Sequence, residues 1–301
     1  GTNLPQNVKS IKGKHSATGG TEEITEATGS CQLKSNTPKG YEQCCKTMVT
    51  EATCDDLKMT CDWGGYTPLT DTNIKDAVTA FKNSQSGGIY GPISKWDVSD
   101  VTDMSELFKD FDKFNENISG WKVGNVLNMS GMFSGCTNFN QPIGKWGEKV
   151  SNVTSMSLMF YGCTSFNQPI GEWDVSSVLS MFYMFNNCTA FNQPIGSWEV
   201  GSVLNMNAMF RYCTHFNQNI DDWDVSSVTD MNVMFYECHA FNQPIGSWDV
   251  GNVTTMNVMF LGCTAFNQDI SDWNVSSVLK MYEMFKGSTA FKQDISDWKN
   301  R

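Results

Sequence analysis

Tryptophan recurs at a fixed interval along most of the chain. Nine of the ten tryptophans, from Trp96 to Trp298, lie 25 residues apart, except that Trp146 and Trp173 are separated by 27. The two additional residues fall within Gly147–Val150. A period of this length is typical of architectures in which one small unit is repeated and stacked, so it restricts the fold more than any other feature of the sequence.

Each repeat carries the same apolar frame of Ile, Trp, Val, Val, Met, Met-Phe, Cys and Phe. Around Trp198 and Val200 the apolar residues alternate with polar ones, which predicts a short strand. The following residues have the i, i+3, i+6, i+7 spacing of one helical face: Val203, Met206, Met209 and Phe210. Each repeat is therefore predicted to run strand, turn, short helix, loop.

One such unit cannot bury its own apolar face, but stacked units share a continuous core. In a stack the strands would pair in parallel at about 4.8 Å, one strand from each repeat, or rung. The pattern thus predicts an α/β solenoid of about eight rungs with one parallel sheet.

The repeat resembles a known family. Its I-x-x-W-x-V spacing is similar to the L-x-x-L-x-L of leucine-rich repeats, and "MFxGCTxF" resembles the "AFxGCxxL" of their BspA-like class. The whole unit is similar to repeats of mycoplasma surface lipoproteins and of secreted bacterial and microalgal proteins. The resemblance implies a right-handed stack in an extracellular interaction or adhesion module.

Composition divides the chain into four segments. Residues 1–30 are polar and predict a flexible or partner-ordered arm, residues 31–65 are rich in cysteine, and residues 66–95 contain the predicted cap helix. Residues 96–301 form the repeats, and the last is a partial rung without an obvious cap. We expect that end to be covered by another chain or by a continuation of the natural protein.

The formal net charge of −11 argues against binding to nucleic acid or to anionic lipid, both of which require clustered Lys and Arg. No apolar run approaches the roughly 20 residues that span a bilayer. The chain begins with Gly, so we expect a targeting segment, if the natural protein has one, to lie outside it.

The cysteines fall into two groups. Five near the N-terminus predict a disulfide framework, and hence an extracellular or lumenal location: Cys31, Cys44, Cys45, Cys54 and Cys61. Six others occur once per repeat, and Phe111 and Ser288 take the same position at the two ends of the series. These six are predicted to be small buried residues, with disulfides between rungs as the alternative.

An acidic strip is the first candidate binding surface. The residues beside each Trp should point away from the core, and from the fourth rung onward they are mostly acidic. The carboxylates either bond nearby backbone N–H groups or bind a cation or a basic partner, and both interpretations stay open. The strip comprises Asp174, Glu199, Asp224, Asp249, Glu172, Asp222 and Asp272.

Variable positions on the predicted helices give a second candidate surface, although packing between neighbouring helices explains them as well. It comprises Tyr161, Phe182, Tyr183, Arg211 and Tyr236. His215 and His239 are expected on surface loops. Six N-x-S/T sequences are compatible with glycosylation, at Asn117, Asn128, Asn152, Asn187, Asn252 and Asn274.

The sequence contains no phosphate loop, metal motif or residue that departs from the repeat as a nucleophile would. It predicts a non-enzymatic, secreted or lumenal interaction module without a cofactor that binds a protein partner. Two alternatives remain: a structural subunit of a larger assembly or fibre, and calcium-dependent binding of a glycan.

Overall fold

The computed structural model describes residues 12–14, 21–23, 69–84 and 90–300. Near the N-terminus, strands β1 (Lys12–Lys14) and β2 (Thr21–Glu23) pair antiparallel, with Lys12 opposite Glu23. The five cysteines predicted to form disulfides lie outside the described residues, as does most of the predicted arm.

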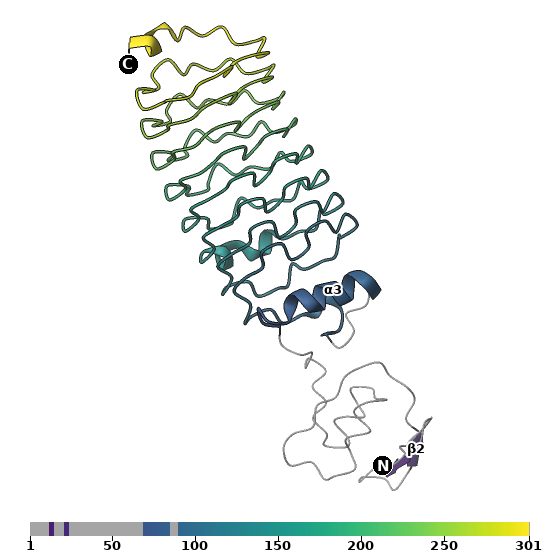
Figure 1. The fold of residues 1–301 in the computed structure, drawn as a ribbon. Coiled ribbons are helices and arrows are strands. Elements are labelled where there is room, and N and C mark those ends of the chain that lie inside the picture. Colours follow the sequence, from purple (N-terminus) through teal and green to yellow (C-terminus); the bar gives the residue numbers. More distant parts are fainter. Residues whose placement is uncertain (1–11, 15–20, 24–68, 85–89, 301) are drawn as a thin grey trace.

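One α-helix, α3 (Ile74–Ser84), covers the N-terminal end of the repeats (Figure 1). Its apolar face is buried, and Phe81 contacts the rings of Trp96 and Phe111 at 6.2 and 6.4 Å between centroids. Just before the helix, the Asp71 carboxylate accepts hydrogen bonds from the backbone N–H groups of Thr102 and Asp103. The helix is thereby joined to the first rung by packing and by polar contacts.

From Trp96 onward the chain forms stacked rungs that follow one another along a single axis (Figure 1). Isolated parallel bridges join each rung to the next, as between Asn205 and Asp230. Around this bridge every second N–H donates to a carbonyl of the following rung: Met206 to Asp230, Ala208 to Asn232, Phe210 to Met234 and Tyr212 to Tyr236, at 3.0, 2.9, 3.0 and 2.8 Å.

The predicted strand at Trp198–Val200 and the predicted helix at Val203–Phe210 are both wrong. Residues 96–300, all described, contain no α-helix and no strand. Their regular structure consists of isolated bridges and two 3-10 segments. Instead, successive tight turns close by hydrogen bonds from Met209 to Met206 and from Cys213 to Phe210. Ala208 and Tyr212 have φ of 54° and 61°, in the left-handed region that interrupts an α-helix.

The apolar frame fills the interior of every inner rung. Trp198, Trp223 and Trp248 stack at 6.4 Å between neighbouring ring centroids, and Phe210 and Phe235 stack at 5.7 Å. From Trp96 to Trp248 each buried indole also finds an acceptor, as Trp248 Nε1 does at the Ile220 carbonyl, 3.1 Å away in the preceding rung. The core of the inner rungs is therefore a set of aromatic columns whose indole N–H groups are paired.

An amide ladder runs beside these columns. The Asn217 side-chain oxygen accepts hydrogen bonds from the backbone N–H of Asn242 and from the Gln243 side chain, at 2.9 and 3.0 Å. The same two bonds recur from Asn140 to Asn267. The repeated "FNQ" of the inner rungs thus joins neighbouring rungs.

The turns are interrupted by the 3-10 segments η2 (Ile93–Lys95), η3 (Gly144–Val150) and η4 (Ser296–Asn300). The two additional residues of the repeat fall in η3, which is kinked at Gly147 (φ 33°) and is visible as the small teal helix within the stack (Figure 1). Among the described residues, no helix has the length and apolar character needed to cross a membrane.

Candidate functional site

Three members of the acidic strip are engaged in turns. Asp174 accepts hydrogen bonds from the Ser176 backbone N–H and hydroxyl at 3.1 and 2.6 Å, and Asp224 accepts the same pair from Ser226 at 3.0 and 2.6 Å. Asp249 accepts one from the Gly251 N–H at 3.0 Å. The Ser226 hydroxyl, followed by its N–H, lowers the pKa of Asp224. These carboxylates shape the backbone as Asx turns, although no helix follows them.

Glu199 takes the same position as these aspartates but makes no such turn bond among the described contacts. Its side chain is longer by one methylene and is exposed, and so are those of Glu172 and Asp222. None of these three carboxylates takes part in an ion pair within the described part of the chain. They therefore present exposed negative charge that no ion pair in the described part of the chain neutralises.

The surface beside them is hollowed. The largest of three adjoining hollows has a volume of about 720 Å³ and is lined by Pro142, Pro169 and Pro194, among other residues. The others measure about 510 and 300 Å³, and Ser197 lines all three. Five strip carboxylates line these hollows, namely Glu172, Asp174, Glu199, Asp222 and Asp224. Asp249 and Asp272 do not line them.

The second candidate surface comes together across several rungs. The rings of Tyr161 and Tyr183 lie 6.2 Å apart, and those of Phe182 and Tyr183 lie 4.4 Å apart. In the neighbouring rungs the Arg211 guanidinium lies over Tyr212 at 4.4 Å and over Tyr236 at 5.2 Å. We name Tyr161, Phe182, Tyr183, Arg211, Tyr212 and Tyr236 the aromatic–arginine surface; its side chains are all partly exposed.

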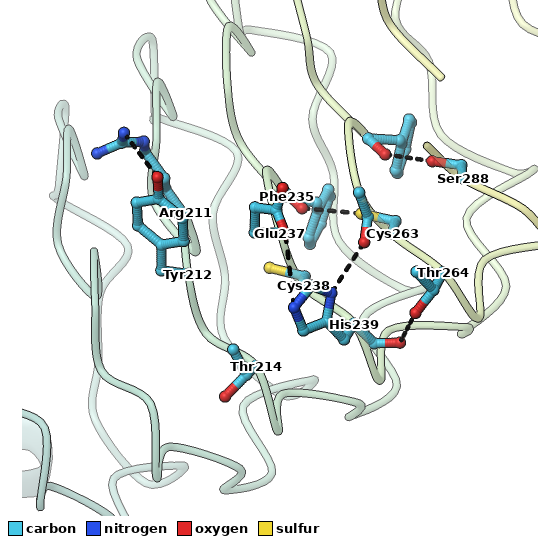
Figure 2. Close-up of polar contacts among 12 residues, drawn as sticks. Arg211, Tyr212, Thr214, Phe235, Glu237, Cys238, His239, Cys263, Thr264 and Ser288 are labelled. Carbon is cyan, nitrogen blue, oxygen red and sulfur yellow. Dashed lines mark hydrogen bonds and ion pairs between the residues drawn. The ribbon is translucent and has the colours of Figure 1, made fainter. Parts of the chain in front are cut away.

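Tyr212 was not predicted as part of this surface. It occupies a left-handed position, its ring meets that of Tyr236 edge-on at 5.3 Å, and its hydroxyl lies 3.3 Å from Arg211 (Figure 2). The sequence did contain a signal for Tyr212, because several other rungs have Gly at the equivalent position and this rung has a bulky aromatic residue. Between the two halves of the surface lies Asn186, which is 1% exposed and whose Nδ2 has no partner among the described residues.

The six cysteines of the repeats are free thiols, so the alternative of disulfides between rungs is wrong. Each donates to a Phe carbonyl of the preceding rung, as Cys263 does to Phe235 at 2.8 Å (Figure 2). The Ser288 hydroxyl makes the same bond to Phe260 in the last rung. Burial raises the pKa of Cys136 to about 12, so these thiols stay protonated and are poor nucleophiles.

The two loop histidines make separate local contacts. His215 Nδ1 lies 2.7 Å from the Thr189 carbonyl oxygen. His239 Nδ1 lies 2.9 Å from the Gly262 carbonyl oxygen, and its Nε2 lies 3.4 Å from the Glu237 carboxylate (Figure 2). Within the described ranges, no group of three or more His, Cys, Asp or Glu side chains is arranged to hold a metal ion.

Rungs that share one buried frame and differ in their surface side chains define a repeat protein. A family model described as "Mycoplasma protein of unknown function, DUF285" matches residues 72–198, 148–238 and 213–301. These matches span the whole repeat region and more than half of the chain, so the chain belongs to this family. No curated protein and no solved structure matches it.

Proposed function

We propose that the chain is a non-enzymatic interaction module that binds a protein partner through the aromatic–arginine surface. The observation that carries this proposal is the stacking of Arg211 on Tyr212 and Tyr236, next to the ring cluster of Tyr161, Phe182 and Tyr183. Tyr and Arg are the residue types that contribute most to protein–protein binding energy, especially when they cluster.

The geometry reduces the entropy that binding costs. Each ring contacts another ring or the guanidinium, so its rotamer is restricted before a partner arrives. The rungs beneath are held by several backbone hydrogen bonds each, which keeps the six side chains in fixed relative positions.

We also propose that the chain is a solenoid of the BspA-like leucine-rich-repeat class. The I-x-x-W-x-V spacing and the "GCT" motif support placing the stack with BspA-like leucine-rich repeats in the solenoid class. A secreted or lumenal location is supported by the five clustered N-terminal cysteines. A non-enzymatic role is supported by the buried, protonated state of the repeat thiols.

The test begins with capture of a partner from the surface fraction of the source cells by the intact chain, followed by identification of that partner. Its affinity is then measured for the wild type, for Arg211→Ala and for Tyr236→Ala. Each substitution is expected to weaken binding by about tenfold or more, as for a hot-spot residue.

Tyr282→Ala is the matched control, because Tyr282 is 69% exposed and lies outside the aromatic–arginine surface. The affinity of the Tyr282→Ala variant for the partner should equal that of the wild type. Unchanged affinity of both Arg211→Ala and Tyr236→Ala for a partner that binds the wild type would refute the proposal.

A further inference from the structure

The largest hollow has a floor of small and apolar groups. Pro142, Pro169 and Pro194 occupy the same position in three consecutive rungs, and all are exposed. In the rungs before and after, Asn117 and Asn219 take this position. The three proline rings therefore form a short apolar row at one place along the stack.

Glycines keep this floor low. A Cβ on Gly144 would lie 2.5 Å from the Pro169 carbonyl oxygen, and one on Gly171 would lie 2.6 Å from that of Pro194. The rungs approach too closely here for any side chain. The hollow is thus a consequence of how tightly the rungs pack at the Pro-Ile-Gly segment.

Negative charge surrounds the floor. Five carboxylates line the three adjoining hollows, whereas Lys145 of η3 is the one cation among their lining residues. The carboxylates of Glu172, Glu199 and Asp222 are exposed and are not engaged in ion pairs within the described chain. An occupant with positive charge would complement them.

The dimensions suit a short extended segment. The hollow crosses four rungs, and three spacings of about 4.8 Å give roughly 14 Å, the length of four to five extended residues. We propose that this hollow, the proline hollow, binds a short basic peptide segment of a partner protein. The apolar or aromatic side chains of the peptide lie on the prolines. Its Lys or Arg side chains pair with Glu172 and Asp222 of this hollow and with Glu199 of the two adjoining hollows.

This site is separate from the aromatic–arginine surface and does not depend on the function proposed above. The two contributions to binding are also separable. Charge pairing at exposed carboxylates is screened by salt, whereas contact with the proline floor is not. A peptide that has both kinds of side chain should therefore bind better than a peptide that has charge alone.

The test uses fluorescein-labelled peptides and anisotropy with the full chain. The probe is Lys-Tyr-Lys-Tyr-Lys-Tyr, compared with Lys-Ser-Lys-Ser-Lys-Ser and Glu-Tyr-Glu-Tyr-Glu-Tyr. The probe is expected to bind with at least roughly threefold higher affinity than the Lys-Ser peptide, and the acidic peptide is expected not to bind. Equal affinity of the two basic peptides, or no binding of the probe, would overturn the proposal.

Two variants locate the binding. The triple substitution Glu172→Gln, Glu199→Gln and Asp222→Asn should lower the affinity for the probe by about tenfold, because it removes the charges that pair with the peptide. None of these three groups shapes a turn, so the fold should be kept. The double substitution Pro169→Asn and Pro194→Asn copies the residue of the next rung and should weaken it by about threefold. Unchanged affinity in either variant contradicts the assigned site.

The matched control removes three exposed carboxylates elsewhere, by Asp112→Asn, Glu116→Gln and Asp297→Asn. It changes the net charge by the same amount as the triple substitution in the hollow. The control should bind the probe within about twofold of wild type, because distant exposed charges are screened. An equal loss in both triple variants would show attraction to the net charge alone and would overturn the proposal.

Discussion

The indole Nε1 of Trp223 donates a 3.0 Å hydrogen bond to the carbonyl oxygen of Ile195, one rung earlier. Both atoms are buried, so the bond joins the rungs where water cannot replace it. Trp223→Phe would keep an aromatic ring but remove this bond between rungs, leaving the carbonyl with only the Trp198 N–H as a donor. We expect a loss of about 2 kcal/mol or more in the free energy of unfolding, measured by urea denaturation and circular dichroism.

Trp298→Phe is the control for this prediction. Trp298 also stacks on its neighbour, at 6.1 Å from Trp273, but its Nε1 has no partner among the described residues. Its replacement should cost less by about 1–3 kcal/mol. Equal losses in the two variants would show that the hydrogen bond does not stabilise the stack.

The left-handed positions predict an unequal response of two glycines. Gly135 has φ of 77°, and a Cβ there would lie 2.7 Å from the Asp110 carboxylate and 3.3 Å from its backbone. Gly135→Ala should therefore destabilise the chain by about 1–2 kcal/mol. Gly124→Ala, whose Cβ would meet nothing within 4 Å, should be neutral or slightly stabilising in the same urea measurement. Equal behaviour would argue against the turn geometry.

The repeat cysteines should be unreactive in the native state. Burial raises the pKa of the Cys188 thiol, and its proton is donated to the Phe160 carbonyl at 2.9 Å. Iodoacetamide at pH 8 followed by peptide mass mapping should leave all six repeat thiols unmodified until denaturant is added. Rapid labelling of these thiols in the native chain would contradict the buried ladder.

Variants of one cysteine distinguish the contribution of the thiol's size from that of its hydrogen bond. Cys213→Ser should be tolerated better than Cys213→Val, because Ser288 already makes the equivalent bond in the last rung. Valine removes the bond between rungs and leaves the Phe185 carbonyl with only the Cys188 N–H as a donor. We expect a difference of about 1 kcal/mol in unfolding free energy. A more stable valine variant would show that packing alone determines the residue at this position.

Acid should weaken the Asx turns. The Ser226 hydroxyl and N–H lower the pKa of Asp224 below its ordinary 3.8, so the carboxylate stabilises the fold above that value. This contribution is lost as the pH falls through the lowered folded-state pKa. Asp224→Asn keeps an acceptor, as Asn274 does toward Ser276, and should reduce the fall in thermal stability between pH 5 and about pH 2. An identical pH dependence in wild type and variant would contradict the role of this carboxylate.

The sequence predicted the period and the buried frame but not the path of the backbone. Met206, Met209 and Phe210 are fully buried as predicted, yet their spacing fits consecutive three-residue turns as well as a helix. Gly131 and Gly135 occupy the two left-handed positions of one rung, but Ala208 and Tyr212 occupy them in a later rung, so glycine marks these turns only in part.

The candidate surfaces were predicted unevenly for a related reason. The aromatic–arginine residues were identified because they vary on a constant frame, but their mutual contacts depend on turns that the period alone does not determine. In the acidic strip, the exchange of Asp for Glu at position 199 was visible in the sequence. The consequence of this exchange, a carboxylate that makes no turn bond, depends on the structural finding that Asp174 and Asp224 are bonded within turns.

Both surfaces depend on the claim that each rung is a series of turns joined to the next rung by alternate N–H groups. NMR measurement of amide exchange and Cα chemical shifts across Met206–Cys213 tests it most directly. The structure predicts slow exchange at Met206, Ala208, Phe210 and Tyr212, with non-helical shifts at the left-handed residues. An unbroken run of helical Cα shifts across this segment would contradict it.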